Sequence, residues 1–198
     1  MKSDSHKITG ILLAGGKSSR MGSDKGILKV NGLAMAEHVI HALEKITSSI
    51  IIIANNENYA QFGYPVYKDV ITDCGPMGGI YTGLLHSETN LNLVVSCDIP
   101  FVSVELLQAL AVSPDKTDIV VPFLGESAQP LCARYRKSCA EKLAGFLDKG
   151  LFKMKDTFST LSIERIDTFS IEGFESRQLA NINSKKELQD IQQELLCR

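Results

Sequence analysis

Residues 12–25 combine glycines and cations in a way that suits the binding of a triphosphate. The segment leaves an apolar run and reads Leu-Leu-Ala-Gly-Gly-Lys-Ser-Ser-Arg-Met-Gly-Ser-Asp-Lys. Its glycines can take positive φ and let backbone N–H groups approach an anion, while its cations add charge for phosphate oxygens. The glycines are Gly15, Gly16 and Gly22, and the cations are Lys17, Arg20 and Lys25. The loop therefore predicts a nucleotide ligand, and we expect Asp24 to orient it.

The loop differs from the two commoner phosphate-binding loops. A P-loop needs G-x-x-x-x-G-K-[ST], but here Ser23 and Asp24 separate Gly22 from Lys25. The dinucleotide fingerprint G-x-G-x-x-G is also absent, because Gly15 and Gly16 are adjacent. Both differences disfavour a kinase, an ATPase or a dehydrogenase.

Short apolar runs alternate with helical patterns along the first two thirds of the chain. Nearly unbroken apolar runs of this length are typical of strands buried on both faces of a parallel sheet. We expect strands at 8–13, 50–54, 91–96, 119–121 and 129–135, and helices around 36–46, 77–85, 104–110 and 139–147. This order predicts a doubly wound, Rossmann-like α/β fold with a mostly parallel sheet. Residues 150–174 give no clear pattern, and Ser184 begins a capping box for a C-terminal helix.

Ligands of open α/β sheets bind beyond the carboxyl ends of the strands. Besides the glycine-rich loop, Asn55-Asn56 and Cys97–Pro100 follow expected strands. Asp69 and the Gly75–Gly79 turn lie between them, and the turn leads into a helix whose N-terminus favours anions. We count Gly78 of this turn among the nucleotide-binding residues.

Asp98 follows a buried strand, so its carboxylate should emerge in the predicted cleft. Mg²⁺ typically binds one or two carboxylates together with phosphate oxygens, and Asp98 is placed to supply one. The alternative is a helix cap, but Ser103 is nearer to the next helix. We therefore expect Asp98 to hold Mg²⁺.

Other reactive side chains have simpler interpretations. His38 and His41 are three residues apart on an expected helix, but no third ligand accompanies them at metal-site spacing. Cys97 beside Asp98 is interpreted as a small buried hydrophobic residue rather than a nucleophile.

The composition predicts one cytoplasmic domain. The 198 residues suffice for a single domain spanning 1–198, and the net charge of −2 shows no basic excess for nucleic acid. The five cysteines are odd in number and scattered, which favours a reducing compartment over disulfides or zinc. No apolar run approaches the length of a membrane span. We expect neither nucleic acid nor membrane as a partner.

Several segments together resemble the molybdenum cofactor guanylyltransferases. They are Leu13–Gly26, Gly75–Gly79, Cys97–Pro100, Gln129-Pro130 and Asn181-Ile-Asn183, and the match covers nearly the whole chain. A wide nucleotidyltransferase superfamily shares the opening motif. The Leu-Ala-Gly-Gly form, the Met-Gly-x-Asp-Lys-Gly ending and the Asn-x-Asn tail favour the guanylyl branch.

The resemblance implies roles for particular residues. Leu13, Ala14 and Gly15 would contact the guanine nucleotide, and Asp69 would lie on its nucleoside side. Lys25 would bind the phosphates, Asp98 would hold Mg²⁺, and Asn183 would lie near the metal or the pterin. Some relatives carry Asn where this chain has Ile53, so that contact passes to Asn55 here. Some also have one more residue between Gly22 and Lys25.

The implied reaction joins GMP to molybdopterin, whose terminal phosphate attacks the α-phosphate of GTP and releases pyrophosphate. An anionic nucleophile needs little general-base help, so Mg²⁺, Lys25 and Arg20 suffice to align and neutralise the phosphates. A molybdoenzyme or a delivery chaperone is the further partner implied. The alternatives are a cytidylyl or sugar-1-phosphate nucleotidyltransferase and a non-catalytic GTP-binding regulator.

Overall fold

The fold is an α/β sandwich built on one mixed sheet. The computed structural model describes residues 7–14, 24–114, 116–157, 159–184 and 186–188. Seven strands follow the order β10-β7-β9-β6-β1-β4-β5, and β8 pairs with β7 off this path. The strands are β1 (Ile8–Leu13), β4 (Ser49–Ile53), β5 (Val66–Tyr67), β6 (Leu91–Ser96), β7 (Ile119–Leu124), β8 (Ser127–Ala128), β9 (Cys132–Arg136) and β10 (Ile163–Asp167), with a separate hairpin of β2 (Lys29–Val30) and β3 (Leu33–Ala34).

The central strands are parallel, as the sequence predicts. Ile11 of β1 lies between Ile51 of β4 and Val94 of β6 in parallel register, and β10 is parallel to β7. Strand β9 runs antiparallel to both β6 and β7. The predicted doubly wound, mostly parallel α/β class is confirmed.

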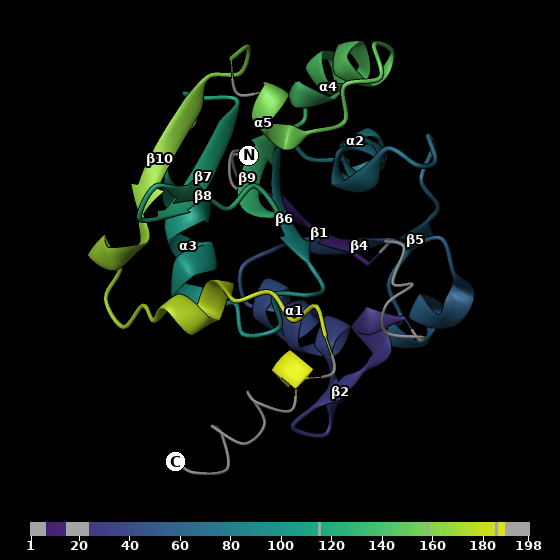
Figure 1. The fold of residues 1–198 in the computed structure, drawn as a ribbon, viewed down its shortest axis with the longest axis vertical. Helices are drawn as coiled ribbons and strands as arrows, with labels where there is room; N and C mark the ends of the chain where they lie inside the picture. Colours follow the sequence, from purple (N-terminus) through teal and green to yellow (C-terminus); the bar gives the residue numbers. More distant parts are fainter. Residues whose placement is uncertain (1–6, 15–23, 115, 158, 185, 189–198) are drawn as a thin grey trace, which may run out of the picture.

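Helices cover both faces of this sheet (Figure 1). On one face, α1 (Met35–Glu44) and α3 (Val104–Val112) pack on one apolar cluster. On the other face, α2 (Gly75–His86) and α4 (Cys139–Leu147) pack on a second cluster. The short elements are α5 (Met154–Thr157), η1 (Lys25–Ile27), η2 (Glu57–Phe62), η3 (Thr168–Ser170) and η4 (Ser176–Leu179).

Strand β1 lies at the position in the sheet where the connecting helices change from one face of the sheet to the other, and this fixes where a ligand can bind. Its side chains alternate between the two clusters, with Leu12 in one and Ile11 in the other. A Cβ on Gly83 of α2 would lie 2.5 Å from Ile11 Cγ2, so α2 packs closely on β1. Ligands of such sheets bind outside the carboxyl ends at the strand order's switch point, which here lies beyond β1 between β4 and β6.

In the second half of the chain, the bounds of the elements differ from those that the sequence predicts. The strand expected at 129–135 begins at Cys132 instead, because a turn precedes it, in which Cys132 N–H donates to the Gln129 carbonyl at 3.1 Å. The pattern-poor region contains α5, β10 and η3. Ser184 Oγ accepts from Glu187 N–H at 3.1 Å, as a capping box requires. Residues 189–198, the remainder of the expected C-terminal helix, lie outside the described residues.

No helix in the described part of the chain is both long enough and apolar enough to cross a membrane.

A carboxylate joins β7, β10 and α4 at the end of the sheet opposite the switch point. Asp118 Oδ2 accepts from Ser162 N–H at 2.8 Å, Ser162 Oγ at 2.9 Å and Lys142 Nζ at 2.7 Å. Burial acts to raise the pKa of Asp118, but the hydrogen bonds from Lys142 and Ser162 outweigh it and lower this pKa. The group therefore stabilises the fold in its ionised form.

Asp118→Asn should lower the free energy of unfolding at pH 7 by about 1–3 kcal/mol, since it weakens charge-assisted hydrogen bonds. A lowered folded-state pKa adds stability that is present above the unfolded value of about 4 and is lost as pH falls through the folded value. The difference between wild type and variant should thus hold from pH 7 to 5 and shrink below about pH 4. Urea unfolding across this range measures it, and a pH-independent difference would contradict the role given to the charge.

Candidate active site

A cavity of about 840 Å³ lies at the carboxyl ends of β1, β4 and β6. Several residues expected from the sequence line it: Leu13, Ala14, Lys25, Asn55, Asp69 and Asp98. Segments far apart in the chain thus meet at the expected edge of the sheet. Gly15, Gly16, Lys17, Arg20 and Gly22 lie outside the described residues.

Asp98 presents a carboxylate oxygen to which no described group donates. It lies two residues after the end of β6, and its Oδ1 is buried without a hydrogen-bond partner in the described residues. Its backbone carbonyl accepts from Ile182 N–H at 2.8 Å, which fixes the main chain at this point. Ser103, not Asp98, caps α3, through its Oγ and Leu106 N–H at 3.2 Å. The alternative interpretation of Asp98 as a helix cap is therefore wrong.

Lys25 reaches across to the C-terminal segment. Its Nζ donates to Asn183 Oδ1 at 2.8 Å. Ile182 is buried against Val30 and Met35, so the segment carrying Asn183 is anchored beside the hairpin and α1. The structure therefore brings Lys25, Asp98 and Asn183 together, although Asn183 itself does not line the cavity.

Asn55 and Asp69 form a reciprocal pair on the β4 side of the cavity. Asn55 Nδ2 donates to Asp69 Oδ2 at 2.8 Å, and Asp69 N–H donates to Asn55 Oδ1 at 3.0 Å. Asp69 Oδ1 is buried and accepts no hydrogen bond from the described residues. One carboxylate oxygen of this pair is therefore without a donor in the described part of the chain.

The Gly75–Gly79 segment is the first part of α2 rather than a turn before the helix. The helix can start here because Pro76 has its φ already fixed for the first turn. Gly75 and Gly79 line the cavity, whereas Gly78 faces the preceding loop, where a Cβ would lie 3.0 Å from the Ile71 carbonyl oxygen. The expectation that Gly78 faces the ligand is thus corrected in favour of Gly79.

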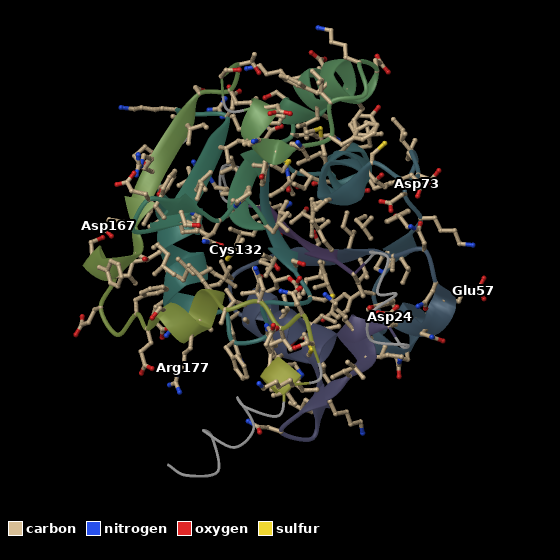
Figure 2. The ribbon with its side chains drawn as sticks, viewed as in Figure 1. Asp24, Glu57, Asp73, Cys132, Asp167 and Arg177 are labelled. Carbon is tan, nitrogen blue, oxygen red and sulfur yellow. The ribbon has the colours of Figure 1, made fainter. Side chains whose placement is uncertain are left out.

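The cavity is also lined by residues that the sequence did not assign to the ligand. They are Asp24, Asn56, Thr72, Asp73, Ser96 and Leu131. Asp24 accepts from Gly26 N–H at 3.1 Å and caps η1. Residues 15–23 of the loop that Asp24 is expected to orient lie outside the described residues. Figure 2 shows Asp24 and Asp73 on the same side of the view.

The cysteine and histidine interpretations hold in the structure. Burial, with nearby Asp98 adding to it, raises the pKa of the Cys97 thiol well above its usual range, so Cys97 is a poor nucleophile. The His38 ring hydrogen-bonds the Val30 carbonyl at 2.8 Å. Within the residues described, no three His, Cys, Asp or Glu side chains group as a metal site. An Asp98 metal site would therefore depend on ligand oxygens.

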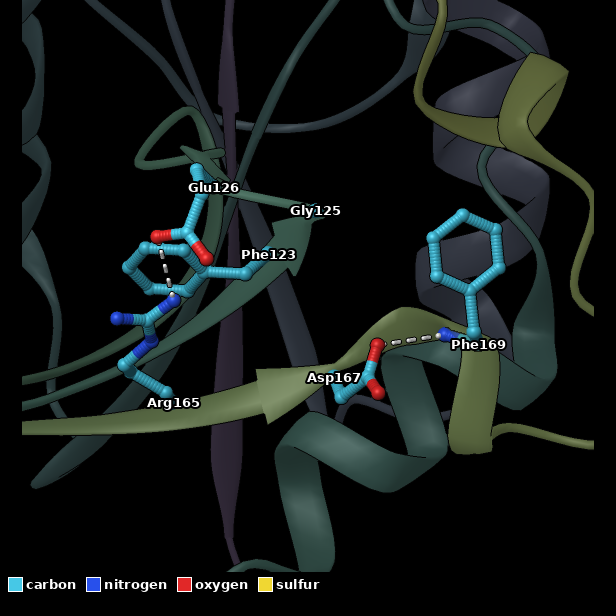
Figure 3. A pocket seen from close by; sticks show the side chains of 6 residues that line it. All are labelled: Phe123, Gly125, Glu126, Arg165, Asp167 and Phe169. Carbon is cyan, nitrogen blue, oxygen red and sulfur yellow. Dashed lines mark hydrogen bonds and ion pairs between the residues drawn. The ribbon is translucent and has the colours of Figure 1, made fainter.

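A smaller depression of about 380 Å³ lies near the ends of β7 and β10 (Figure 3). The Arg165 guanidinium stacks 3.8 Å from the centre of the Phe123 ring and pairs with Glu126 at 3.5 Å. Asp167 Oδ1 accepts from Phe169 N–H at 3.1 Å. Arg165 and Glu126 thus pair with each other, and Figure 2 shows Asp167 on the opposite side of the view from Asp24.

Solved structures with this fold include nucleotidyltransferases. "Molybdopterin-guanine dinucleotide biosynthesis protein A" from Archaeoglobus fulgidus matches with a TM-score of 0.81 and 21% identity, covering 96% of this chain and 100% of that one. The 2-C-methyl-D-erythritol 4-phosphate cytidylyltransferase from Thermus thermophilus matches with a TM-score of 0.73 and 14% identity, covering 97% and 100%. At these identities the likeness concerns the fold alone.

Fold, cavity and sequence together define a nucleotidyltransferase. Residues 10–161 match the model of the MobA-like NTP transferase domain. The chain belongs to this family. A "probable molybdenum cofactor guanylyltransferase" of Flavobacterium johnsoniae is 38% identical over 185 residues, covering 93% of this chain and 96% of the relative. A molybdenum cofactor guanylyltransferase of Vibrio campbellii is 42% identical over 146 residues, covering 71% and 74%.

Proposed function

We propose that this protein transfers GMP from GTP to molybdopterin, giving the guanine dinucleotide form of the molybdenum cofactor and pyrophosphate. The observation that carries the proposal is the meeting of Lys25 and Asp98 at one cavity beyond β1, in a chain 38% identical to a probable guanylyltransferase over 93% of its length. A cation and a carboxylate oxygen without a donor among the described residues, both from residues that line one cavity, suit a triphosphate with its metal ion.

In this proposal the two sides of the cavity bind different parts of GTP. Lys25 and Arg20 bind phosphates together with the amides of Gly15 and Gly16. Leu13, Ala14, Asn55 and Asp69 contact the nucleoside, where Asp69 Oδ1 can accept from a ligand N–H or O–H. The Leu13 carbonyl already accepts from Cys97 N–H at 2.9 Å, so it mainly shapes the wall. Asn183 lies on the acceptor side beside Lys25.

The Asp98 carboxylate fits Mg²⁺, because its buried Oδ1 lacks a donor among the described residues and hard oxygen ligands suit this ion. When bound, Mg²⁺ would neutralise negative charge on the triphosphate. Asp98 would be its protein ligand, and phosphate oxygens would supply the others.

The reaction breaks the bond between the α-phosphorus and its bridging oxygen to pyrophosphate, and forms a bond to the terminal phosphate oxygen of molybdopterin. The attacking oxygen is already anionic, so the site needs no side chain to remove a proton. Catalysis then rests on alignment and on charge neutralisation by Lys25 and Arg20. A buried, protonated Cys97 agrees with this division of roles.

The product would pass to a molybdoenzyme or to a delivery chaperone. We place the enzyme in the cytoplasm, a setting supported by the absence of paired cysteines in the described residues, where four free cysteines are buried.

The proposal predicts a strong preference for GTP. Each magnesium nucleotide is incubated with the protein and molybdopterin, and pyrophosphate is measured. The pocket wall is expected to present acceptors to the N–H donors of guanine. Binding of another base leaves these acceptors unpaired, which costs about 1–3 kcal/mol of binding free energy for each one. GTP should therefore win in competition with ATP or CTP by roughly an order of magnitude or more.

Two other outcomes have distinct meanings. Equal or better use of CTP would move the protein to a cytidylyl branch without changing the phosphate-side roles. Tight GTP binding with no pyrophosphate release would leave a non-catalytic GTP-binding protein.

A further inference from the structure

We infer that Tyr59 and Asn56 are positioning residues for Lys25, which they hold in place through Asp24. The inference rests on the proposed function, because it assigns these residues to the placement of a phosphate-binding cation. Neither residue is adjacent to Lys25 in sequence, and both come from the segment that follows β4.

Asp24 is held by three donors on its two carboxylate oxygens. Its Oδ1 accepts from Tyr59 Oη at 2.5 Å and from Gly26 N–H at 3.1 Å. Its Oδ2 accepts from Asn56 Nδ2. The carboxylate therefore ties the end of the glycine-rich loop to η2 on one side and to the backbone of η1 on the other.

Tyr59 is a rigid partner for this carboxylate. Its side chain is fully buried in the core cluster under α1, so the phenol cannot move away from Asp24 without leaving the core. Burial raises the pKa of Tyr59 far above its usual range, with Cys97 and the Asp24 hydrogen bond adding to this shift. The hydroxyl is thus protonated at neutral pH and can donate to Asp24.

Gly26 packs directly over the same phenol. A Cβ on Gly26 would overlap the Tyr59 hydroxyl and lie 3.0 Å from two ring carbons. Only glycine lets the backbone pass this close. Lys25 therefore lies between two residues that both contact Tyr59, and its Cα has little freedom to move.

Asn56 is adjacent in sequence to Asn55, but the two amides bind different carboxylates. Asn55 pairs with Asp69, whereas the next residue, Asn56, pairs with Asp24. Asn56 Oδ1 also caps η2 by accepting from Asn58 N–H at 2.7 Å. Asn55 thus holds a carboxylate on the expected nucleoside side of the cavity, and Asn56 holds one on the expected phosphate side.

The test replaces Tyr59 by phenylalanine, which keeps the ring in the core and removes only the hydroxyl. Loss of one hydrogen bond to a charged group should lower kcat/KM for GTP about tenfold or more. Tyr64→Phe is the matched control, because Tyr64 also donates to a carboxylate, Glu44 at 2.6 Å, but outside the cavity. Tyr64→Phe should leave the kinetics at wild-type values.

A positional role is separated from a general loss of stability by repeating Tyr59→Phe in a Lys25→Ala background. If Tyr59 acts through Lys25, the second substitution adds little to the first. An equal loss of activity in both backgrounds, or wild-type kinetics for Tyr59→Phe, would overturn the inference.

Asn56→Ala provides a second route if Tyr59→Phe does not fold. It removes the other side-chain donor to Asp24 without opening the core, and it should show the same dependence on Lys25. If Asn56→Ala lowers kcat/KM by the same factor in the Lys25→Ala background as in the wild type, the inferred positioning role is contradicted.

Failure of the proposed function would be visible separately. Wild-type protein that binds GTP but releases no pyrophosphate would refute the proposed function alone. Calorimetric titration with GTP then compares wild type with Tyr59→Phe, and equal affinities would refute the positioning role.

Discussion

Asp98→Ala should abolish pyrophosphate release while leaving the protein folded. A carboxylate that binds a metal ion on the triphosphate is worth several kcal/mol in the transition state, which corresponds to about 10³-fold in rate. No described residue donates to Asp98 Oδ1, so removing the side chain breaks no hydrogen bond at that atom. Since a partly buried carboxylate whose Oδ1 has no donor among the described residues is itself costly, the unfolding temperature should stay unchanged or rise.

The measurement pairs single-turnover pyrophosphate release with thermal unfolding, and adds Mn²⁺ binding in the presence of GTP as a readout independent of activity. Asp148→Ala is the matched control, because Asp148 is an exposed aspartate at the end of α4. It should retain both activity and metal binding. Pyrophosphate release by Asp98→Ala near the wild-type rate would remove Asp98 from the metal site.

The central sheet could be predicted from the sequence because its strands are buried on both faces. Strands β1 and β6 have the bounds expected from their apolar runs, since burial on both faces leaves only Thr9, Asn92 and Ser96 as polar residues in the pattern. Strand β9 was expected to begin too early, at Gln129. Gln129 is polar and does not continue the apolar pattern of the strand. Its carbonyl instead closes a turn by accepting from Cys132 N–H.

The outer strand β10 could not be predicted because its neighbours give it little burial. Its residues Ile-Glu-Arg-Ile-Asp range from half-buried to exposed, so the apolar signal is weak. Its position is fixed by long-range contacts instead. Asp118 just before β7 binds Ser162 just before β10, and this pairing joins residues 44 positions apart.

At the site, the sequence identified the groups that face the cavity but missed those that hold them. Asp98 and Lys25 could be found because they follow strand ends or lie in a glycine-rich loop. Tyr59 could not, because a tyrosine in a short 3₁₀ helix looks like any core aromatic residue until its hydroxyl is seen on Asp24. The orientation of Gly78 also depends on where α2 begins, which the turn-like composition of Gly75–Gly79 obscured.

Lys25→Ala should weaken GTP binding and slow transfer together. A cation on the triphosphate acts in both the ground state and the transition state, so KM rises and kcat falls. Hydrogen bonds to charged groups contribute about 1.5–3 kcal/mol, which predicts a loss of roughly 10- to 100-fold in kcat/KM. Steady-state kinetics with GTP varied at saturating molybdopterin separates the two parameters.

Two further variants show whether this loss comes from the charge. Lys25→Met keeps most of the aliphatic chain, so it should lose as much activity as Lys25→Ala if the ammonium group is what matters. Lys149→Ala removes an exposed lysine distant in sequence and should behave as wild type. Because Lys25 Nζ donates to Asn183 at 2.8 Å, Asn183→Ala should cost less than Lys25→Ala, since the cation remains. Unchanged KM and kcat in Lys25→Ala would instead make Lys25 a surface charge that contacts Asn183 but no substrate.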